Sequence, residues 1–310
     1  HGKAASETDT SDFNRPLKGH GKRQIQRIGA WLQQNSLLPD RVLTSPAVRA
    51  ANSANKALKA GGSGIREVEQ DPRLYNASLG TLLQVLGEVP SRDKRLMMVG
   101  HNPGFQALVL HLAGTALLPA SEWKMGAGCL CHIAMPENWQ QLDAGCARVI
   151  GIVRPKNLPR KFPFPGPDST ELRDRPAYYY RQSAVIPYRI TKGRLEILVV
   201  TSSRKNHWVV PKGIHDPDLS ARDSAAREAM EEAGIIGQVG ETPLGRYSFH
   251  KWGSLCNVVV YPMEVTRVFP HGEWEENHRE RRWVSPADAI EHLKADGLKT
   301  IVRDFAAHMP

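Results

Sequence analysis

The sequence has few cysteines and no long apolar run. Its 310 residues include only 4 cysteines, and their spacing does not supply the two ligand pairs of a structural zinc site. Buried free thiols are therefore expected, which favours a cytoplasmic protein. No apolar stretch reaches the ~20 residues of a membrane span, and no signal peptide is visible, although a missing N-terminus would conceal one. A disulfide scaffold and a membrane protein are excluded at this stage.

The length and a proline-rich segment predict two domains. A chain of 310 residues can bury two separate cores. The segment 154–167 is basic and rich in proline, which is typical of an extended linker. We therefore expect domains at 1–155 and 177–310, joined by a linker at 156–176 that is too irregular for either core.

The positive charge is concentrated in the first half. The formal net charge is +9, of which residues 1–160 carry +8. A basic domain suits anionic substrates. No nucleic-acid motif accompanies the charge, so we expect a phosphorylated small molecule as partner, and neither a specific nucleic acid nor a membrane.

An acidic helix is the most informative local feature. Glu228, Glu231 and Glu232 have the i, i+3, i+4 spacing that places side chains on one helical face. Ser220 is the expected N-cap, and Gly234 the expected end of the helix. Hard oxygen ligands of this kind suit Mg²⁺ or Mn²⁺ together with a substrate phosphate. A solvated acidic face is the alternative.

The wider pattern around these glutamates resembles the Nudix box. Its matching positions are Gly213, Arg227, Glu228, Ala229, Glu231, Glu232, Gly234 and Ile235. Leu219 stands where the box has its first glutamate, so the partner of Arg227 is in doubt, and Asp216 or Asp218 is a candidate substitute. The resemblance implies catalytic, metal-binding roles for Glu228, Glu231 and Glu232, with the Gly213 carbonyl as a further ligand.

The flanking residues narrow the resemblance. The segment is similar to the diphosphoinositol polyphosphate phosphohydrolase branch. The similarity lies in the strand-like run Leu195–Val200 and in the tryptophans Trp208, Trp274 and Trp283. That branch implies metal-dependent hydrolysis of P–O–P bonds in nucleoside polyphosphates, dinucleoside polyphosphates or inositol pyrophosphates. A polyphosphate demands cations, and the candidates for substrate binding are Arg204, Lys205, Lys212, Arg281 and Arg282. The general base is open among Glu273, Glu275 and Glu276.

A second set of candidate catalytic residues lies in the first half. The chain opens with His1, and Ser45-Pro46 is expected to begin a helix that carries Arg49 in its first turns. The apolar run Leu96–Val99 reads as a strand that leads into His101 and a helix over 105–112. Open α/β sheets bind ligands at the carboxyl ends of their strands.

These pieces resemble the histidine phosphatase superfamily, in particular its SixA-like branch, over residues 1–155. The resemblance implies that His1 is a nucleophile that becomes phosphorylated, with Arg49 and His101 stabilising the transferring phosphoryl group. No cofactor is implied. The family's first strand, and the arginine before the nucleophile, are missing, from which we infer a truncated sequence. Glu69 is a candidate general acid.

The expected fold class is α/β in both halves. The first domain is predicted to be a three-layer α/β/α histidine phosphatase-like domain, and the second an α/β/α Nudix fold with a mixed sheet. The leading hypothesis is a Nudix pyrophosphohydrolase fused to a phosphatase. One alternative is a protein phosphohistidine phosphatase regulated by a nucleotide-sensing Nudix module. The other is a degenerate Nudix box, marked by Leu219, that only binds ligand.

Overall fold

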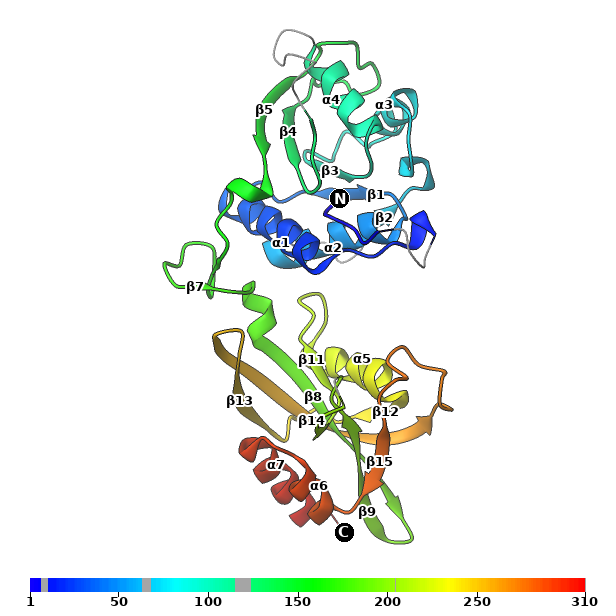
Figure 1. Ribbon diagram of the computed structural model, residues 1–310, viewed down its shortest axis with the longest axis vertical. Coiled ribbons are helices and arrows are strands. Elements are labelled where there is room, and N and C mark those ends of the chain that lie inside the picture. Colours follow the sequence, from blue (N-terminus) through cyan, green and yellow to red (C-terminus); the bar gives the residue numbers. More distant parts are fainter. Residues whose placement is uncertain (7–10, 63–67, 115–123, 204, 310) are drawn as a thin grey trace. The chain divides into compact units, whose positions relative to one another are not determined.

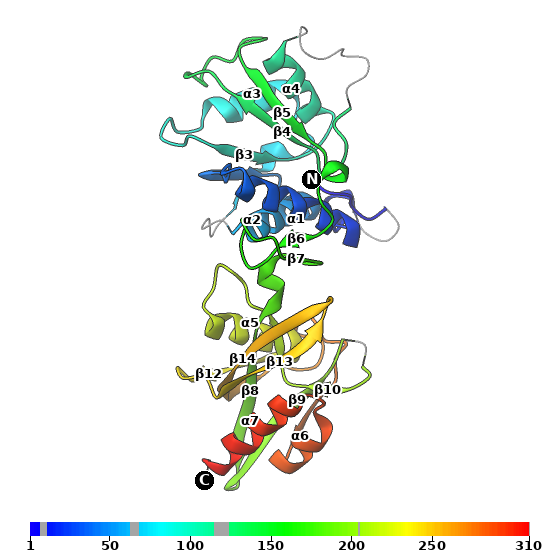
Figure 2. The same ribbon diagram turned by 90° about the vertical axis from the view of Figure 1, so that its left-hand side faces the viewer.

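The computed structural model describes residues 1–6, 11–62, 68–114, 124–203 and 205–309. The chain divides into two compact units, His1–Leu172 and Arg173–Pro310. Both units are mixed α/β, in agreement with the predicted class (Figures 1 and 2). None of the helices in the described ranges is long and apolar enough to cross a membrane.

The first unit has a short parallel sheet with helices on both faces. The sheet order is β2-β1-β3, and both neighbours of β1 run parallel to it. A separate antiparallel hairpin joins β4 and β5. The elements are η1 (Asp12–Asn14), α1 (Gly19–Gln34), β1 (Arg41–Thr44), α2 (Val48–Gly61), β2 (Glu69–Gln70), η2 (Pro72–Leu74), α3 (Leu79–Gly87), β3 (Leu96–Val99), α4 (Gly104–Ala113), β4 (Leu130–Ala134), β5 (Arg148–Val153) and η3 (Pro155–Asn157).

Alternation along β1 explains the three layers of this unit. Successive residues of a strand point to opposite faces. Val42 packs with Ala54 and Leu58 of α2, whereas Leu43 packs with the core under α3 and α4. The strands over 41–44 and 96–99 and the helix over 105–112 are found where the sequence predicts them, within one residue.

The start of α2 differs from the prediction. The helix begins at Val48 with Ala47 as N-cap, so Ser45 and Pro46 lie in the turn before it. The hydroxyl of Ser45 accepts a hydrogen bond from the Ala47 amide at 3.3 Å, and its other contact is with His101. Ser45 therefore serves the turn and the neighbouring strand end rather than the helix.

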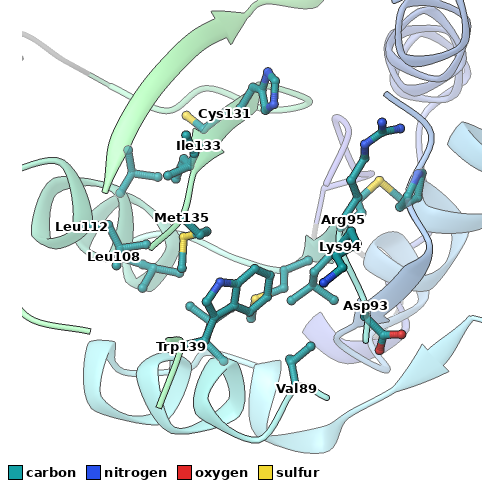
Figure 3. A pocket seen from close by; sticks show the side chains of 18 of the residues that line it. Val89, Asp93, Lys94, Arg95, Leu108, Leu112, Cys131, Ile133, Met135 and Trp139 are labelled. Carbon is teal, nitrogen blue, oxygen red and sulfur yellow. The ribbon is translucent and has the colours of Figure 1, made fainter. Parts of the chain in front are cut away.

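A large cavity lies between two unpaired strand edges in the first unit. Within the described ranges, β3 pairs only with β1 and β4 only with β5. The cavity has a volume of about 1400 Å³ and is lined by Met98 of β3 and Ile133 of β4, among others. Figure 3 shows Leu108, Leu112, Met135 and Trp139 gathered around its apolar part. No strand described here lies between β3 and β4, and the expectation of a missing first strand stays a prediction.

The proline-rich segment contains η3 and β6 (Phe162–Pro163). β6 pairs with β7 (Leu172–Arg173), which follows the segment. Phe162 is only 2% exposed. The linker bounds of 156–176 stay a prediction.

The second unit is a mixed sheet between helices. The sheet order is β10-β9-β8-β14-β12, with β11 beside β8, β13 beside β14 and β15 beside β9. Among the strand pairs of this sheet that the structure describes, the β14–β8 pair is the parallel one. The strands are β8 (Arg181–Thr191), β9 (Arg194–Thr201), β10 (Trp208–Val209), β11 (Lys212–Ile214), β12 (Ile235–Val239), β13 (Gly245–Lys251), β14 (Ser254–Val268) and β15 (Arg281–Val284).

The helices of this unit cover both faces of the sheet. They are η4 (Ala177–Tyr180), α5 (Ala221–Ala233), α6 (Pro286–His292) and α7 (Asp296–Ala307). Val185 and Leu198 face the alanines of α5, whereas Ala184 and Ile197 face α6 and α7. The small alanines allow α5 to lie close to the sheet, which brings its glutamates to the end of β11.

Candidate active sites in the two units

The ends of α5 are those that the sequence predicts. The Ser220 hydroxyl accepts a hydrogen bond from the Asp223 amide at 3.0 Å, as expected for an N-cap. Gly234 ends the helix with a left-handed φ of 59°, and a Cβ on this glycine would lie 2.7 Å from the Trp274 ring. Glycine is therefore required here both for the turn and for the contact with Trp274.

Asp216 replaces the missing first glutamate of the box as the partner of Arg227. Its carboxylate accepts a hydrogen bond from Nη2 of Arg227, and it is only 5% exposed. The Asp216 amide also donates to the Ser224 hydroxyl at 3.1 Å. Leu219 contributes its backbone carbonyl, which accepts from the His215 ring at 2.9 Å. The loop before α5 is thus held by Asp216.

Two of the three box glutamates, the buried Glu232 and the partly buried Glu228, lie against β11. The Glu228 carboxylate lies so close to Gly213 that a Cβ there would be 2.0 Å from Oε1. Burial, together with the charges of Glu232 and Glu231, raises the pKa of Glu228 to about 8. Burial likewise raises the pKa of Glu232 to about 7, against the opposing effect of Arg279. Clustered carboxylates with raised pKa values are typical of functional sites.

Glu232 is bound on both of its oxygens. Oε2 accepts from the Lys212 amide at 3.0 Å, and Oε1 accepts from Nη2 of Arg279 at 2.5 Å. Glu231 lies nearer the surface, with its Oε1 3.6 Å from Nε of Arg227. Arg279 is a site residue that sequence reasoning missed, because it reaches α5 from 47 positions away.

The donor set fits a divalent cation, although the side chains are not gathered as ligands. Over the described ranges, no group of three or more His, Cys, Asp or Glu side chains is arranged to hold a metal ion. The charges of Glu232 and Glu231 nevertheless raise the pKa of Glu228. Hard oxygen donors that repel one another are what Mg²⁺ or Mn²⁺ neutralises.

The predicted cationic residues have different surroundings. Lys212 donates to Oε1 of Gln182 at 3.2 Å and lies 4.6 Å over the Phe249 ring, and burial lowers its pKa. Arg281 instead donates to main-chain carbonyls, including that of Ala233 at 2.6 Å.

The remaining predicted cations lie nearer the surface or outside the described ranges. Arg282 is exposed and lies 5.1 Å over the Trp208 ring. Lys205 forms an ion pair with Glu280 at 3.6 Å. Arg204 lies outside the described residues.

Of the three candidate general bases, only Glu276 reaches the cluster of box glutamates and Arg279. Its Oε2 accepts from Nε of Arg279 at 2.5 Å, and its amide donates to the Glu231 carbonyl at 3.0 Å. Glu273 and Glu275 are exposed.

In the first unit, Arg49 joins the two predicted histidines. It is 3% exposed, and its Nε donates to Nε2 of His1 at 3.3 Å. Its Nη2 lies 3.3 Å from Nδ1 of His101, and the two imidazole rings are 5.0 Å apart. All three predicted residues therefore meet at the carboxyl end of β3, where α/β sheets bind ligands.

Hydrogen bonds define the tautomers of both histidines. Nδ1 of His1 is 2.7 Å from the Gly2 carbonyl, which only accepts, so Nδ1 carries the proton and Nε2 carries the lone pair that accepts from Arg49. For His101, Nδ1 accepts from Arg49, and Nε2 lies 2.8 Å from the Ser45 hydroxyl. Burial and the Arg49 charge lower the pKa of His101 to about 4, which keeps it neutral.

Asp12 completes this cluster and was not predicted as a site residue. Its Oδ2 accepts from Nη2 of Arg49 at 2.8 Å and from the Tyr75 hydroxyl at 2.7 Å. Nε of Arg15 donates to Oδ1 at 3.0 Å. The Tyr75 hydrogen bond, followed by those from the two arginines, lowers the pKa of Asp12 well below its usual range. Glu69, the candidate acid, pairs instead with Arg41.

Comparison with known proteins agrees with the division into two units. The NUDIX domain family matches residues 180–305, and the histidine phosphatase superfamily (branch 1) matches residues 1–86. Nudix hydrolase 12 of Arabidopsis thaliana is 30% identical, over 43% of this chain and 77% of that protein. Diphosphoinositol polyphosphate phosphohydrolase 2 of Rattus norvegicus is 33% identical, over 41% of this chain and 70% of that protein.

A solved structure of the protein histidine phosphatase SixA, complexed with tungstate, is 21% identical with a TM-score of 0.43, covering 51% of this chain and 94% of that one. The two domains together define a hydrolase. The chain belongs to the Nudix hydrolases, and a histidine phosphatase domain precedes its Nudix domain.

Proposed function

We propose that the second unit hydrolyses P–O–P bonds in nucleoside polyphosphates, dinucleoside polyphosphates or inositol pyrophosphates. The observation that carries this proposal is the position of the buried Glu232 and the partly buried Glu228 at the end of β11, both with raised pKa values. Such a cluster is stable in its charged form only with a cation beside it. Relatives whose names include diphosphoinositol polyphosphate phosphohydrolase support the substrate class.

The chain's own residues would hold and orient the reactants. Glu228, Glu231, Glu232 and the Gly213 carbonyl would hold Mg²⁺ or Mn²⁺, and the ion would screen the phosphates and acidify the attacking water. Lys212 and Arg282 would bind phosphate oxygens, as would Lys205 and Arg204 from the preceding segment. Glu276 is the carboxylate best placed to accept a proton from water, because it lies in the same cluster.

We infer that the first unit transfers a phosphoryl group to His1. Nε2 of His1 carries the lone pair that accepts from Arg49 in this structure and that would form the P–N bond. The bond from phosphorus to the leaving group breaks as this bond forms, and water later releases phosphate from the histidine. Arg49, which reaches both rings, would stabilise the charge on the phosphoryl oxygens.

The four cysteines are free thiols, which supports a reducing compartment such as the cytoplasm.

The test is a substrate panel assayed for phosphate and nucleotide release with and without Mg²⁺ and Mn²⁺. Glu232→Gln should abolish metal-dependent cleavage, whereas Glu273→Gln, at an exposed position, should not. Metal-independent or absent cleavage across the panel would reject the proposal.

A second assay addresses the first unit. His1→Ala should abolish phosphate release from a phosphorylated small molecule or from a phosphohistidine protein, and comparison of these two substrates decides which class it uses. Release that is unchanged by His1→Ala would reject the nucleophile.

A further inference from the structure

One buried guanidinium joins three segments beside α5. Arg279 is 6% exposed. Its Nη2 donates to Glu232 on α5 and its Nε to Glu276, both at 2.5 Å. Its Nη1 donates to the main-chain carbonyl of Thr201, at the end of β9, at 3.0 Å. A planar guanidinium can hold several acceptors in one fixed fork, which an ammonium cannot do.

The contacts of Arg279 set the orientation of Glu232. With Lys212 donating to the other oxygen at 3.0 Å, the Glu232 carboxylate has a defined plane and position. Each carboxylate oxygen has two lone pairs, so both oxygens keep one for a further ligand. Without the guanidinium, the carboxylate would rotate about its side chain and lose this orientation.

Arg279 also brings a carboxylate from outside the helix into the cluster. Glu276 is anchored to α5 by its amide, which donates to the Glu231 carbonyl at 3.0 Å, and its side chain is turned toward Arg279. Glu232 and Glu276 thereby bind the same guanidinium. One cation of the chain thus offsets part of the negative charge that gathers near Gly213.

We propose that Arg279 is the positioning residue of the metal site: by binding Glu232 and Glu276 together, it orients Glu232 for a divalent cation and holds Glu276 next to it. The inference rests on the proposed function of the second unit. Groups that orient a ligand typically change metal affinity by about 10–100-fold when they are removed. A purely structural ion pair would change the stability of the protein but not its affinity for metal.

The experiment measures Mn²⁺ binding to the full chain by electron paramagnetic resonance, with thermal unfolding of the same samples in chelator. Arg279→Met should weaken Mn²⁺ binding by about 10–100-fold, in samples that still unfold cooperatively. Arg279→Lys should recover part of the affinity, because an ammonium can hold one carboxylate but not both. Arg303→Met, an exposed arginine on α7, is the matched control and should bind Mn²⁺ like the wild type.

A double mutant separates positioning from general destabilisation. Glu276→Gln should weaken binding in the wild type but have little further effect in Arg279→Met, because the second variant already releases Glu276. Unchanged or tighter Mn²⁺ binding by Arg279→Met would overturn the inference while leaving the metal site itself intact. Failure of the wild type to bind Mn²⁺ would instead reject the proposed function.

Discussion

The carboxylate of Asp216 binds the guanidinium of Arg227, eleven residues further along the chain. This ion pair joins the loop after β11 to the middle of α5, and Asp216 is nearly fully buried while Arg227 is half-exposed. The box pattern has a glutamate at position 219, where this chain has Leu219. A different residue of the same loop thus performs the expected contact.

Asp216→Asn should weaken this connection. Because Arg227 is partly solvated, we expect a loss of only about 1–2 kcal/mol in the free energy of unfolding. Hydrolysis by the second unit should fall about tenfold or more, since α5 carries its glutamates. Denaturant unfolding and initial rates measure the two effects, with the exposed Asp304→Asn as control.

Leu219→Glu restores the glutamate of the box pattern and tests whether Asp216 has replaced it. In an otherwise wild-type chain, this substitution should change the rate of hydrolysis less than twofold, because Asp216 already holds Arg227. Equal loss of activity in Asp216→Asn and Asp304→Asn would show that the pair has no role in positioning α5.

Gly213→Ala should displace the Glu228 carboxylate. The added methyl would lie 2.0 Å from Oε1 of Glu228, so the side chain must move. Because that atom is the end of a flexible side chain, we expect a stability loss of about 1–2 kcal/mol but a fall in hydrolysis of about 100-fold. Gly166→Ala, where a methyl meets nothing within 4 Å, is the control. Full activity of Gly213→Ala would place the site elsewhere.

The raised pKa of Glu228 predicts a pH-dependent stability of the metal-free protein. The folded value of about 8 exceeds the ordinary 4.5, so the folded state binds more protons between these values. The stability that this group contributes is full below pH 4.5 and is lost as pH rises through about 8. Thermal unfolding in chelator should show the decline, and Glu228→Gln should reduce it to the part that comes from Glu232, whose pKa is raised to about 7.

Metal binding has the opposite dependence on pH. A cation needs the deprotonated carboxylates, so Mn²⁺ affinity should increase from pH 6 to 8.5. Titrations at several pH values measure this trend, and an affinity independent of pH across the range would contradict it.

Arg49→Lys should inactivate the first unit. A lysine cannot contact His1, His101 and Asp12 together, as the guanidinium does. We expect a loss of about 100-fold or more in phosphate release, and about 2–4 kcal/mol in stability because Arg49 is buried. Arg73→Lys is the control, since Arg73 is an exposed partner of Glu88. Activity within threefold of the wild type would remove Arg49 from the site.

Local signals predicted much of this fold. The capping residues Ser220 and Gly234 place both ends of α5, and short apolar runs place β1 and β3, because these elements depend on contacts between near neighbours in the chain. The start of α2 was placed too early, since Ser45 is bound by His101 from another strand end. The capping preference of a single residue takes no account of such a contact with a distant segment.

Residue types and their spacing were enough to indicate the two families and the acidic face of α5, and to select His1, Arg49 and His101 as candidate residues. Residue types at fixed spacings carry that information, since the chemistry of a site depends on them. The tertiary structure alone decided that Asp216 and not Asp218 holds Arg227, and that Arg279 binds Glu232. It also decided that Asp12 joins the histidine site. These pairs depend on how distant segments pack, and many partners are compatible with the same spacing along the chain.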